Sequence, residues 1–308
     1  MHPPISPQEL EHHSGSLARP VHGPEADALL AAWPEGGGAR APLRKPKAPR
    51  AESTLLFRFP HSTDARDPID VHRGDLDRCA PGEYLNDSLI NLGLRQLVQA
   101  ADGRAIGDAT KVHVFSSLFF TVLREGHGKG PRAAYERVLS WARGDLFGTD
   151  VVLVPVHDRL HWSLAAVCHL RHLGSDEPKK RPVIVVLDSL VGVHDPEEVA
   201  ACLRAFLAEE WRSIRGTDGS NGAAIAALRE LRLRTPSAPQ QANLVDCGVF
   251  CLRFGKEVVA AAATAKFRGG KWRPVEMRPG EAADLRRELL EECERLGGAY
   301  SAAIVGGC

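Results

Sequence analysis

One cysteine in this chain stands in a setting that suits nucleophilic chemistry. Cys247 lies between Asp246 and Gly248 at the start of an apolar run, six residues after Gln241. A thiol nucleophile must become a thiolate, and its attack on a carbonyl needs hydrogen-bond donors aimed at the oxyanion that forms. Cys247 supplies the sulfur and a backbone N–H, and Gln241 supplies a side-chain amide. Gly248 leaves room for a substrate carbonyl to approach the backbone.

Such a thiol also needs a base and a group that orients the base. His161 precedes Trp162 at the start of an apolar segment, and Asp188 follows the five apolar residues 183–187. A carboxylate at the end of a buried strand needs a polar partner, and the imidazole of His161 would supply one while having its own tautomer fixed. We therefore predict that Cys247, His161 and Asp188 act as nucleophile, base and orienting acid.

These assignments have competitors in the chain. The alternative bases near His161 are His157, His169 and His172. His157 is the strongest of them because it is only four residues away. Gln240 lies next to Gln241 and carries the same amide. Taken singly, a buried structural cysteine, a turn aspartate and surface amides would be the ordinary interpretations. Because the cysteine, the aspartate and the glutamine occur together, we prefer the catalytic interpretation to these structural ones.

Together with two segments nearer the N-terminus, these residues resemble the Ulp/SENP cysteine proteases, which process ubiquitin-like modifiers. The resemblance runs from about residue 83 to about residue 255, through five blocks in the family's order. The blocks are residues 84–91, residues 114–123, His161-Trp162, Asp188-Ser189, and Gln241 with residues 246–248. It implies an α+β, papain-like (adenain-like) cysteine peptidase, in which helices flank a central mixed sheet. The nucleophile would lie at a helix N-terminus, where the helix dipole and a neighbouring imidazolium favour a thiolate.

The resemblance also assigns roles to individual residues. Its spacing selects Gln241, rather than Gln240, as the oxyanion donor beside the Cys247 N–H. Tyr84 and Trp162 would form the walls of a narrow channel for the modifier's Gly-Gly tail. Glycine has no side chain, so it is the residue that passes such a constriction. Asn86 and Asp87 fit two roles, capping a helix or contacting the modifier, and the sequence leaves both open.

The chain departs from the family pattern in three ways. Tyr84 replaces the usual Trp, which keeps an aromatic wall but changes its width. Leu244 stands where the family often has Gly, so it would be strained if that position required a positive φ. The segments that join His161 to Asp188 and Asp188 to Cys247 are longer than usual, and we expect the extra residues to lie in loops.

The implied reaction is cleavage after the C-terminal Gly-Gly of a ubiquitin-like modifier, as SUMO deconjugation or precursor processing. A Nedd-type modifier or ubiquitin is the alternative substrate, and a non-catalytic module that binds a ubiquitin-like protein is the alternative function. The predicted partners are the modifier and its conjugates, and we expect a monomer. No metal or organic cofactor is implied, since the pair Cys247 and Cys251 has no second cluster to complete a zinc site.

Composition sets the remaining expectations. The 308 residues are 44% hydrophobic, enough for one sizeable core, and 39 basic residues balance 39 acidic ones. This neutrality argues against a dedicated nucleic-acid binder. The seven cysteines have no disulfide-like spacing, and the chain contains neither a signal peptide nor a run of about 18 apolar residues. We expect an intracellular protein, in the nucleus or cytoplasm, without a membrane span.

The chain should divide into three parts. Residues 1–50 are rich in Pro and Gly and should be disordered, with a basic patch at residues 40–50 that fits either a solvated linker or a nuclear-import signal. Residues 51–300 should form the protease domain, and residues 301–308 a flexible tail.

Hydrophobic periodicity predicts the elements of the domain. Three buried strands, at residues 150–157, 162–168 and 182–188, should be neighbours in one sheet, with His161 heading the second and Asp188 ending the third. Residues 231–234 should add an edge strand, and residues 216–222 a flexible insertion. The predicted helices start near Asn86 and Cys247 and span residues 131–143, 196–214 and 280–296.

Overall fold

The computed structural model describes residues 53–60, 67–102, 110–142, 144–178, 180–262 and 272–306. All of them belong to one compact unit, residues 39–308. The predicted disordered segment 1–50 and its basic patch lie outside the described residues.

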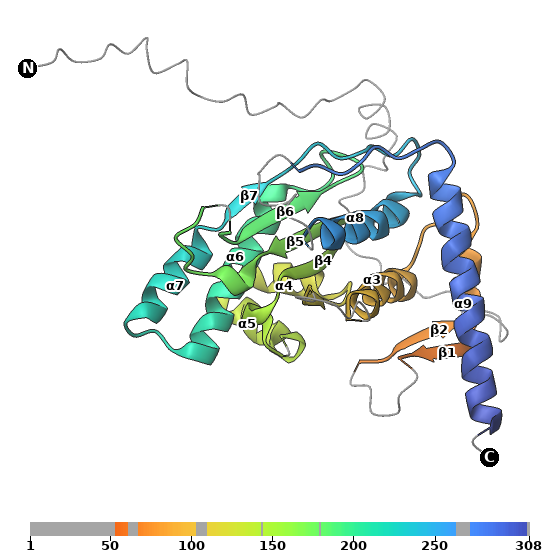
Figure 1. The fold of residues 1–308 in the computed structure, drawn as a ribbon, viewed down its shortest axis with the longest axis horizontal. Helices are drawn as coiled ribbons and strands as arrows, with labels where there is room; N and C mark the ends of the chain where they lie inside the picture. The colour runs from red at the N-terminus through yellow and green to blue at the C-terminus, as the bar shows by residue number, and fades with distance from the viewer. Residues whose placement is uncertain are drawn as a thin grey trace, which may run out of the picture. The chain divides into compact units, whose positions relative to one another are not determined.

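A five-stranded sheet forms the centre of the fold (Figure 1). Its strands, in spatial order, are β3 (Val112–Val114), β4 (Val151–Asp158), β5 (His161–Cys168), β6 (Val183–Leu187) and β7 (Arg232–Arg234). The β4–β5 and β5–β6 pairs are antiparallel, whereas β3–β4 and β6–β7 are parallel, so the sheet is mixed, as predicted. The three predicted buried strands are neighbours, and β7 lies at an edge of the sheet.

The register of the sheet fixes where the chemistry-bearing residues lie. A two-residue turn, Arg159–Leu160, joins β4 to β5, and both its residues have positive φ values of 49° and 60°. This is the backbone of a type I′ hairpin turn, and it makes His161 the first residue of β5, paired with Asp158. Leu164 pairs with Leu187, so Asp188 follows β6 at the same end of the sheet as His161.

Side chains of the sheet alternate between two hydrophobic clusters, one on each face. Val151, Leu164 and Leu187 belong to the cluster shared with helices α3 (Asp87–Asp102) and α8 (Cys247–Ala262). Val152, Ala165 and Val186 belong to the other cluster. That second cluster includes α4 (Phe119–His127), α5 (Pro131–Val138), α6 (Pro196–Arg215) and α7 (Ser220–Arg229). Because both faces are covered, β5 is buried along its whole length.

A smaller layer packs beside α3 and α8. The hairpin of β1 (Leu55–Phe59) and β2 (Ile69–His72) and the long helix α9 (Glu281–Gly306) contribute to the same cluster as α3 and α8. Between β2 and α3 the chain forms the short helices α2 (Arg73–Leu76) and η1 (Asp77–Cys79). Of the described helices, none combines the length and the apolar character that crossing a membrane requires.

The structure differs from the predicted elements in three places. The helix predicted at residues 131–143 ends at Val138 and continues as a 3-10 turn, η2 (Leu139–Trp141). The predicted insertion at residues 216–222 instead leads into α7. Helix α9 continues to Gly306, so residues 301–306 are helical rather than a flexible tail. Gly297 weakens the helix signal in the sequence, but its backbone packs against Leu56, where an added Cβ would lie 3.0 Å from Leu56 Cγ.

Two helical glycines should respond in opposite ways to substitution by alanine, because one lies at the contact between α4 and α5 and the other faces open space. An added Cβ at Gly126 would lie 2.6 Å from the backbone Cα of Ala134, whereas at Gly298, in α9, it would meet no atom within 4 Å. We expect Gly126→Ala to lower the free energy of unfolding by about 1–3 kcal/mol because of overpacking. Gly298→Ala should raise it by about 0.5–1 kcal/mol. Urea unfolding measures both, and a Gly126→Ala variant as stable as the parent chain would contradict the packing.

Candidate active site

Cys247 is the first residue of α8 and its side chain is fully buried. Its sulfur therefore lies at the positive end of a sixteen-residue helix, which favours a thiolate. The next residue, Gly248, lacks a side chain because of packing, which the sequence did not show. A Cβ at this position would lie 2.8 Å from Leu85 Cβ and 3.2 Å from Ile90 Cδ1. The missing side chain thus lets α8 approach the start of α3.

His161 and Asp188 form a short hydrogen bond at the end of the sheet. The distance from His161 Nε2 to Asp188 Oδ1 is 2.6 Å, and Oδ1 also accepts the backbone N–H of Leu190 at 2.9 Å. The side chain of His161 is 1% exposed and that of Asp188 is 10% exposed. Cys247 lies close enough to the ring of His161 to raise the pKa of the imidazole. The structure thus brings together the three residues predicted as nucleophile, base and orienting acid.

Burial and pairing act in opposite directions on the charge of His161. Burial lowers the pKa of the imidazole, but the hydrogen bonds to Asp188 and Cys247 and the charges of these two groups outweigh it and raise the pKa to about 9. His161 is therefore protonated at neutral pH. An imidazolium beside a cysteine stabilises the thiolate and stands ready to donate a proton.

The three rival histidines do not share this position. The ring of His157, on β4, lies against Trp162, with ring centroids 4.2 Å apart. Burial lowers the pKa of His157. His169 and His172 follow the other end of β5, eight or more residues from His161. A β-strand of eight residues spans more than 20 Å, so neither ring replaces that of His161.

The two adjacent glutamines differ in their surroundings. Gln241 is buried, its Oε1 accepts from Ser189 Oγ at 2.7 Å, and its Nε2 donates to the Asn243 carbonyl at 2.6 Å. One amide hydrogen of Gln241 thus remains for an oxyanion. Gln240 is exposed, and its Nε2 donates to the carbonyls of Asp188 and Ala238, both at 3.0 Å. Both of its amide hydrogens are engaged, so Gln240 serves to hold the loop after β6.

Asn243 organises the loop that precedes the nucleophile. Its Oδ1 accepts the backbone N–H groups of Val245 at 3.0 Å and Asp246 at 2.9 Å, and its Nδ2 donates to Asp246 Oδ2 at 2.7 Å. Leu244 is not among the non-glycine residues with positive φ in the described part of the chain. The strain considered for Leu244 is therefore absent, because the Asn243 turn forms without a left-handed residue.

The residues predicted to contact the substrate lie around the start of α3. Trp162 is buried, and its Nε1 donates to the Leu85 carbonyl at 3.1 Å. Tyr84 is half-buried, and its pKa is raised by burial and by the charge of Cys247, which places its ring near the nucleophile. Asn86 Oδ1 accepts the Leu89 N–H at 3.2 Å and so caps α3. Asp87 is exposed in the first turn of α3.

His194 is a neighbour of the site that sequence reasoning missed. It is 6% exposed, its Nδ1 lies 2.7 Å from Ser163 Oγ, and its ring centroid is 5.1 Å from that of His161. Burial lowers the pKa of His194 to about 4, against the opposing charge of Asp188, so this ring is neutral. Its position in the turn after β6 gave no periodic signal that could have singled it out.

His161, Asp188 and His194 are also the residues that come nearest to a metal-binding group. One ligand atom from each lies within 4.8 Å of the others. However, His161 Nε2 is bonded to Asp188 and His194 Nδ1 to Ser163. Within this group of three, the buried atoms that lack a hydrogen-bond partner are Asp188 Oδ2 and His194 Nε2. Two ligands do not provide the three that a catalytic zinc site uses.

Comparison with known proteins places this geometry in a family. The C-terminal catalytic domain of the Ulp1 protease family matches residues 83–268. The chain belongs to the Ulp1 protease family. Ubiquitin-like-specific protease 1C of Arabidopsis thaliana is 32% identical over 243 residues, covering 74% of this chain and 41% of the relative. Human sentrin-specific protease 2 is 27% identical over 185 residues, covering 60% of this chain and 27% of the relative. The chain spans between 25% and 41% of the length of the Arabidopsis relatives it matches.

Solved structures of Ulp1 proteases share the fold. The C-terminal Ulp1 protease domain in complex with Smt3, the yeast orthologue of SUMO, matches with a TM-score of 0.55 and 19% identity, covering 92% of this chain and 99% of that one. A de-sumoylating protease matches with a TM-score of 0.58 and 19% identity, covering 78% and 92%. The predicted papain-like α+β fold, with its mixed sheet flanked by helices, is confirmed.

The raised pKa of His161 predicts a pH dependence. Turnover that needs the imidazolium should fall as the pH rises through about 9. Asp188→Asn removes the main group that raises this pKa, so the falling limb should move to lower pH. Turnover at neutral pH should drop by roughly 10³–10⁴-fold, as when the acid of such a triad becomes an amide. The measurement is kcat between pH 6 and pH 10, with Asp176→Asn, an exposed carboxylate, as control. An unmoved limb in Asp188→Asn would contradict the assignment.

Proposed function

We propose that this chain is a cysteine-type peptidase that cleaves after the C-terminal Gly-Gly of a ubiquitin-like modifier. The observation that carries the proposal is the buried ring of His161, which is hydrogen-bonded to Asp188 and lies close to Cys247, the first residue of α8. A binding module would have no use for such a buried nucleophile and base. Membership of a protease family supports the same chemistry.

The geometry supports a two-step reaction. The Cys247 thiolate attacks the carbonyl of the last glycine, and the oxyanion accepts hydrogen bonds from the Cys247 N–H and the free amide hydrogen of Gln241. His161 then donates its proton to the leaving amine, which departs as the bond to nitrogen breaks and a thioester remains. In the second step neutral His161 takes a proton from water, the hydroxide replaces sulfur at the carbonyl, and the modifier leaves with a free carboxylate.

SUMO is the first choice of modifier, followed by a Nedd-type modifier and ubiquitin. The names of the relatives support this order, since the sentrin-specific and de-sumoylating proteases act on modifiers of that kind. The bond cleaved would be an isopeptide bond to lysine or the peptide bond of a modifier precursor. A protease of such substrates would act inside the cell, so the location we propose is the nucleus or cytoplasm.

Probes with a C-terminal vinyl sulfone test the proposal directly. SUMO, Nedd-type and ubiquitin probes are incubated separately with the chain, and adducts are located by mass spectrometry. We expect the SUMO probe to label Cys247. Cys247→Ser should abolish labelling, while Cys251→Ser, which alters a buried thiol one turn further along α8, should retain it. Failure of all three probes to react would overturn the proposal, and tight probe binding without an adduct would favour the binding-module alternative.

The aromatic wall predicts a second result. Tyr84 lies near Cys247 and precedes the Leu85 carbonyl that Trp162 binds, so its ring can close one side of the Gly-Gly channel. We expect Tyr84→Ala to lower kcat/KM by roughly 10–100-fold, because the tail is no longer held in line with the sulfur. Tyr84→Phe keeps the wall and should stay within about 2-fold of the parent value. Equal losses in both variants would show that the hydroxyl, rather than the wall, is what matters.

A further inference from the structure

A buried arginine from the C-terminal helix α9 reaches the loop that carries the nucleophile. The side chain of Arg286 is 3% exposed, and that of its partner Asp246 is 16% exposed. Nε and Nη2 of Arg286 donate to Asp246 Oδ1 at 3.0 Å and 2.7 Å, and Nη2 also donates to the Val245 carbonyl at 3.1 Å. Nη1 donates to the carbonyls of Arg78 and Ala80, both at 3.2 Å. All five N–H groups of the guanidinium are thus used.

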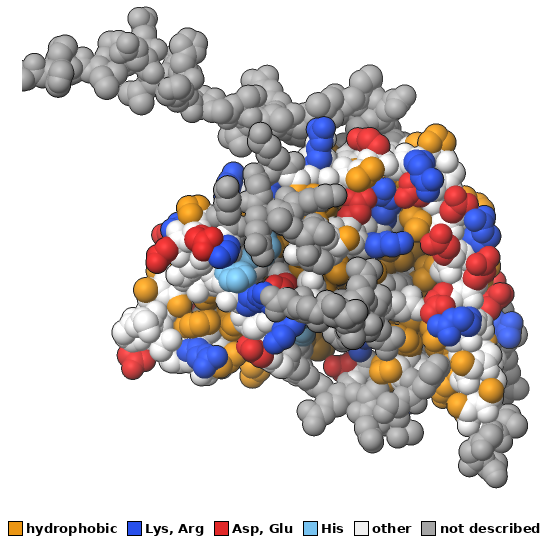
Figure 2. Space-filling view, in the orientation of Figure 1, with side chains coloured by type: hydrophobic (Ala, Val, Ile, Leu, Met, Phe, Trp, Pro, Cys, Tyr) orange, Lys and Arg blue, Asp and Glu red, His pale blue; other side chains and the backbone are white. Residues whose placement is uncertain are grey.

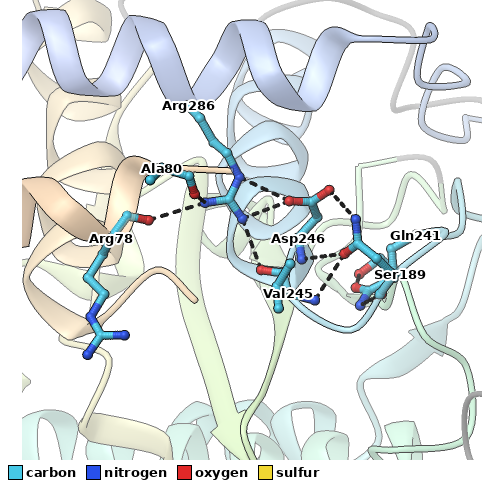
Figure 3. A network of polar contacts seen from close by, with 8 residues as sticks. Arg78, Ala80, Ser189, Gln241, Val245, Asp246 and Arg286 are labelled. Atoms are coloured by element: carbon cyan, nitrogen blue, oxygen red, sulfur yellow. Dashed lines mark hydrogen bonds and ion pairs between the residues drawn. The ribbon is translucent and has the colours of Figure 1, made fainter. Parts of the chain in front are cut away.

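Arg286 joins three segments that are far apart in the chain (Figure 3). Its partners lie 206 and 208 residues away in the turn around η1, and 40 and 41 residues away in the loop before α8. The turn around η1 leads to Tyr84, and the loop before α8 leads to Cys247. The outward side of α9 is different, because acidic and basic side chains are interspersed along it (Figure 2). Exposed Arg287, for example, pairs with Asp284 at 2.8 Å.

The link from Arg286 to the oxyanion donors has two branches. In the first, Asp246 contributes the carbonyl of the peptide group that contains the Cys247 N–H. This carbonyl accepts the Phe250 N–H at 3.1 Å, and the Asp246 carboxylate is held by Arg286. A peptide group is planar, so fixing Asp246 fixes the direction of the Cys247 N–H.

The second branch leads to Gln241. Asp246 Oδ2 accepts from Asn243 Nδ2 at 2.7 Å, and the Asn243 carbonyl accepts from Gln241 Nε2 at 2.6 Å. Both oxyanion donors therefore depend on one carboxylate, and that carboxylate is oriented by one guanidinium. Without the guanidinium, the carboxylate and three carbonyls would face one another with no cation between them, which is unfavourable in a buried place.

We propose that Arg286 is a positioning residue, which aligns the Cys247 N–H and the Gln241 amide for oxyanion binding by holding Asp246. This rests on the proposed function, because it assigns a role within the same site. Arg286 lies beyond the residues 83–268 that match the catalytic domain of the family. The C-terminal helix is thereby part of the machinery that aligns the site.

Two reactions of Cys247 separate positioning from folding and docking. Hydrolysis of a modifier with a C-terminal fluorogenic amide forms an oxyanion, whereas attack on a modifier vinyl sulfone does not. We expect Arg286→Leu to lower kcat for hydrolysis by roughly 10–100-fold, the scale of a misaligned oxyanion donor. KM and the rate of vinyl sulfone labelling should change by less than about 3-fold. Arg287→Leu, one residue further along the same helix, is the matched control and should retain the parent kcat.

A second variant, Arg286→Lys, provides a test of the inference even if Arg286→Leu fails to fold. Lysine keeps the positive charge but has three donors on one atom instead of a planar fork, so it cannot bind both Asp246 and the carbonyls around η1. We expect a folded protein whose kcat falls by roughly 10-fold while labelling is retained. A parent-like kcat in Arg286→Lys, or equal losses in hydrolysis and labelling for both variants, would overturn the inference. A parent chain that hydrolyses no modifier would instead overturn the proposed function.

Discussion

The site depends on keeping a charged imidazole in a place that water hardly reaches. Burial alone would lower the pKa of His161 and favour the neutral ring. The hydrogen bond of 2.6 Å to Asp188, together with the nearby Cys247, raises the pKa and favours the imidazolium. The carboxylate in turn keeps its position because the Leu190 N–H binds the same oxygen. A charge in the protein interior persists only when its partners are rigid, and here each partner is fixed by the backbone at the end of a strand or the start of a helix.

The sheet supplies that rigidity. The turn Arg159–Leu160 leaves only two residues between β4 and β5. This fixes the register of the two strands, and with it the position of His161 opposite Asp158. Pairing of Leu164 with Leu187 then brings Asp188 to the same end of the sheet. Helix α8 completes the arrangement, because Gly248 lets it lie against Leu85 and thereby sets the position of its first residue.

The sequence was informative where the signal is local. The apolar runs that form β4, β5 and β6, and the polar residues at their ends, were visible as patterns, so their order in the sheet was predictable. Asn86 and Asp87 could not be separated as helix caps, because the choice depends on which side chain turns back to the Leu89 N–H. Gly248 was interpreted as space for substrate, whereas its neighbour is Leu85 in another element.

Interactions across long stretches of chain were beyond sequence reasoning. Arg286 is one of the three arginines of α9, and nothing in its helical spacing shows that it contacts Asp246 rather than solvent. His194 likewise stands in a turn, and its neighbours His161 and Ser163 belong to a different element, β5. The catalytic roles of Cys247, His161 and Asp188 stay predictions, as do the roles of Gln241, Tyr84, Asp87 and Trp162 at the substrate, because all of them concern a reaction that the fold does not itself display.

The complete burial of Cys247 has a consequence for the resting protein. A thiolate is readily oxidised by peroxide, and the rate depends on access as well as on charge. A sulfur with no exposed surface is shielded from small oxidants while the protein is idle. Any rearrangement that opened this sulfur to a substrate carbonyl would also open it to small oxidants.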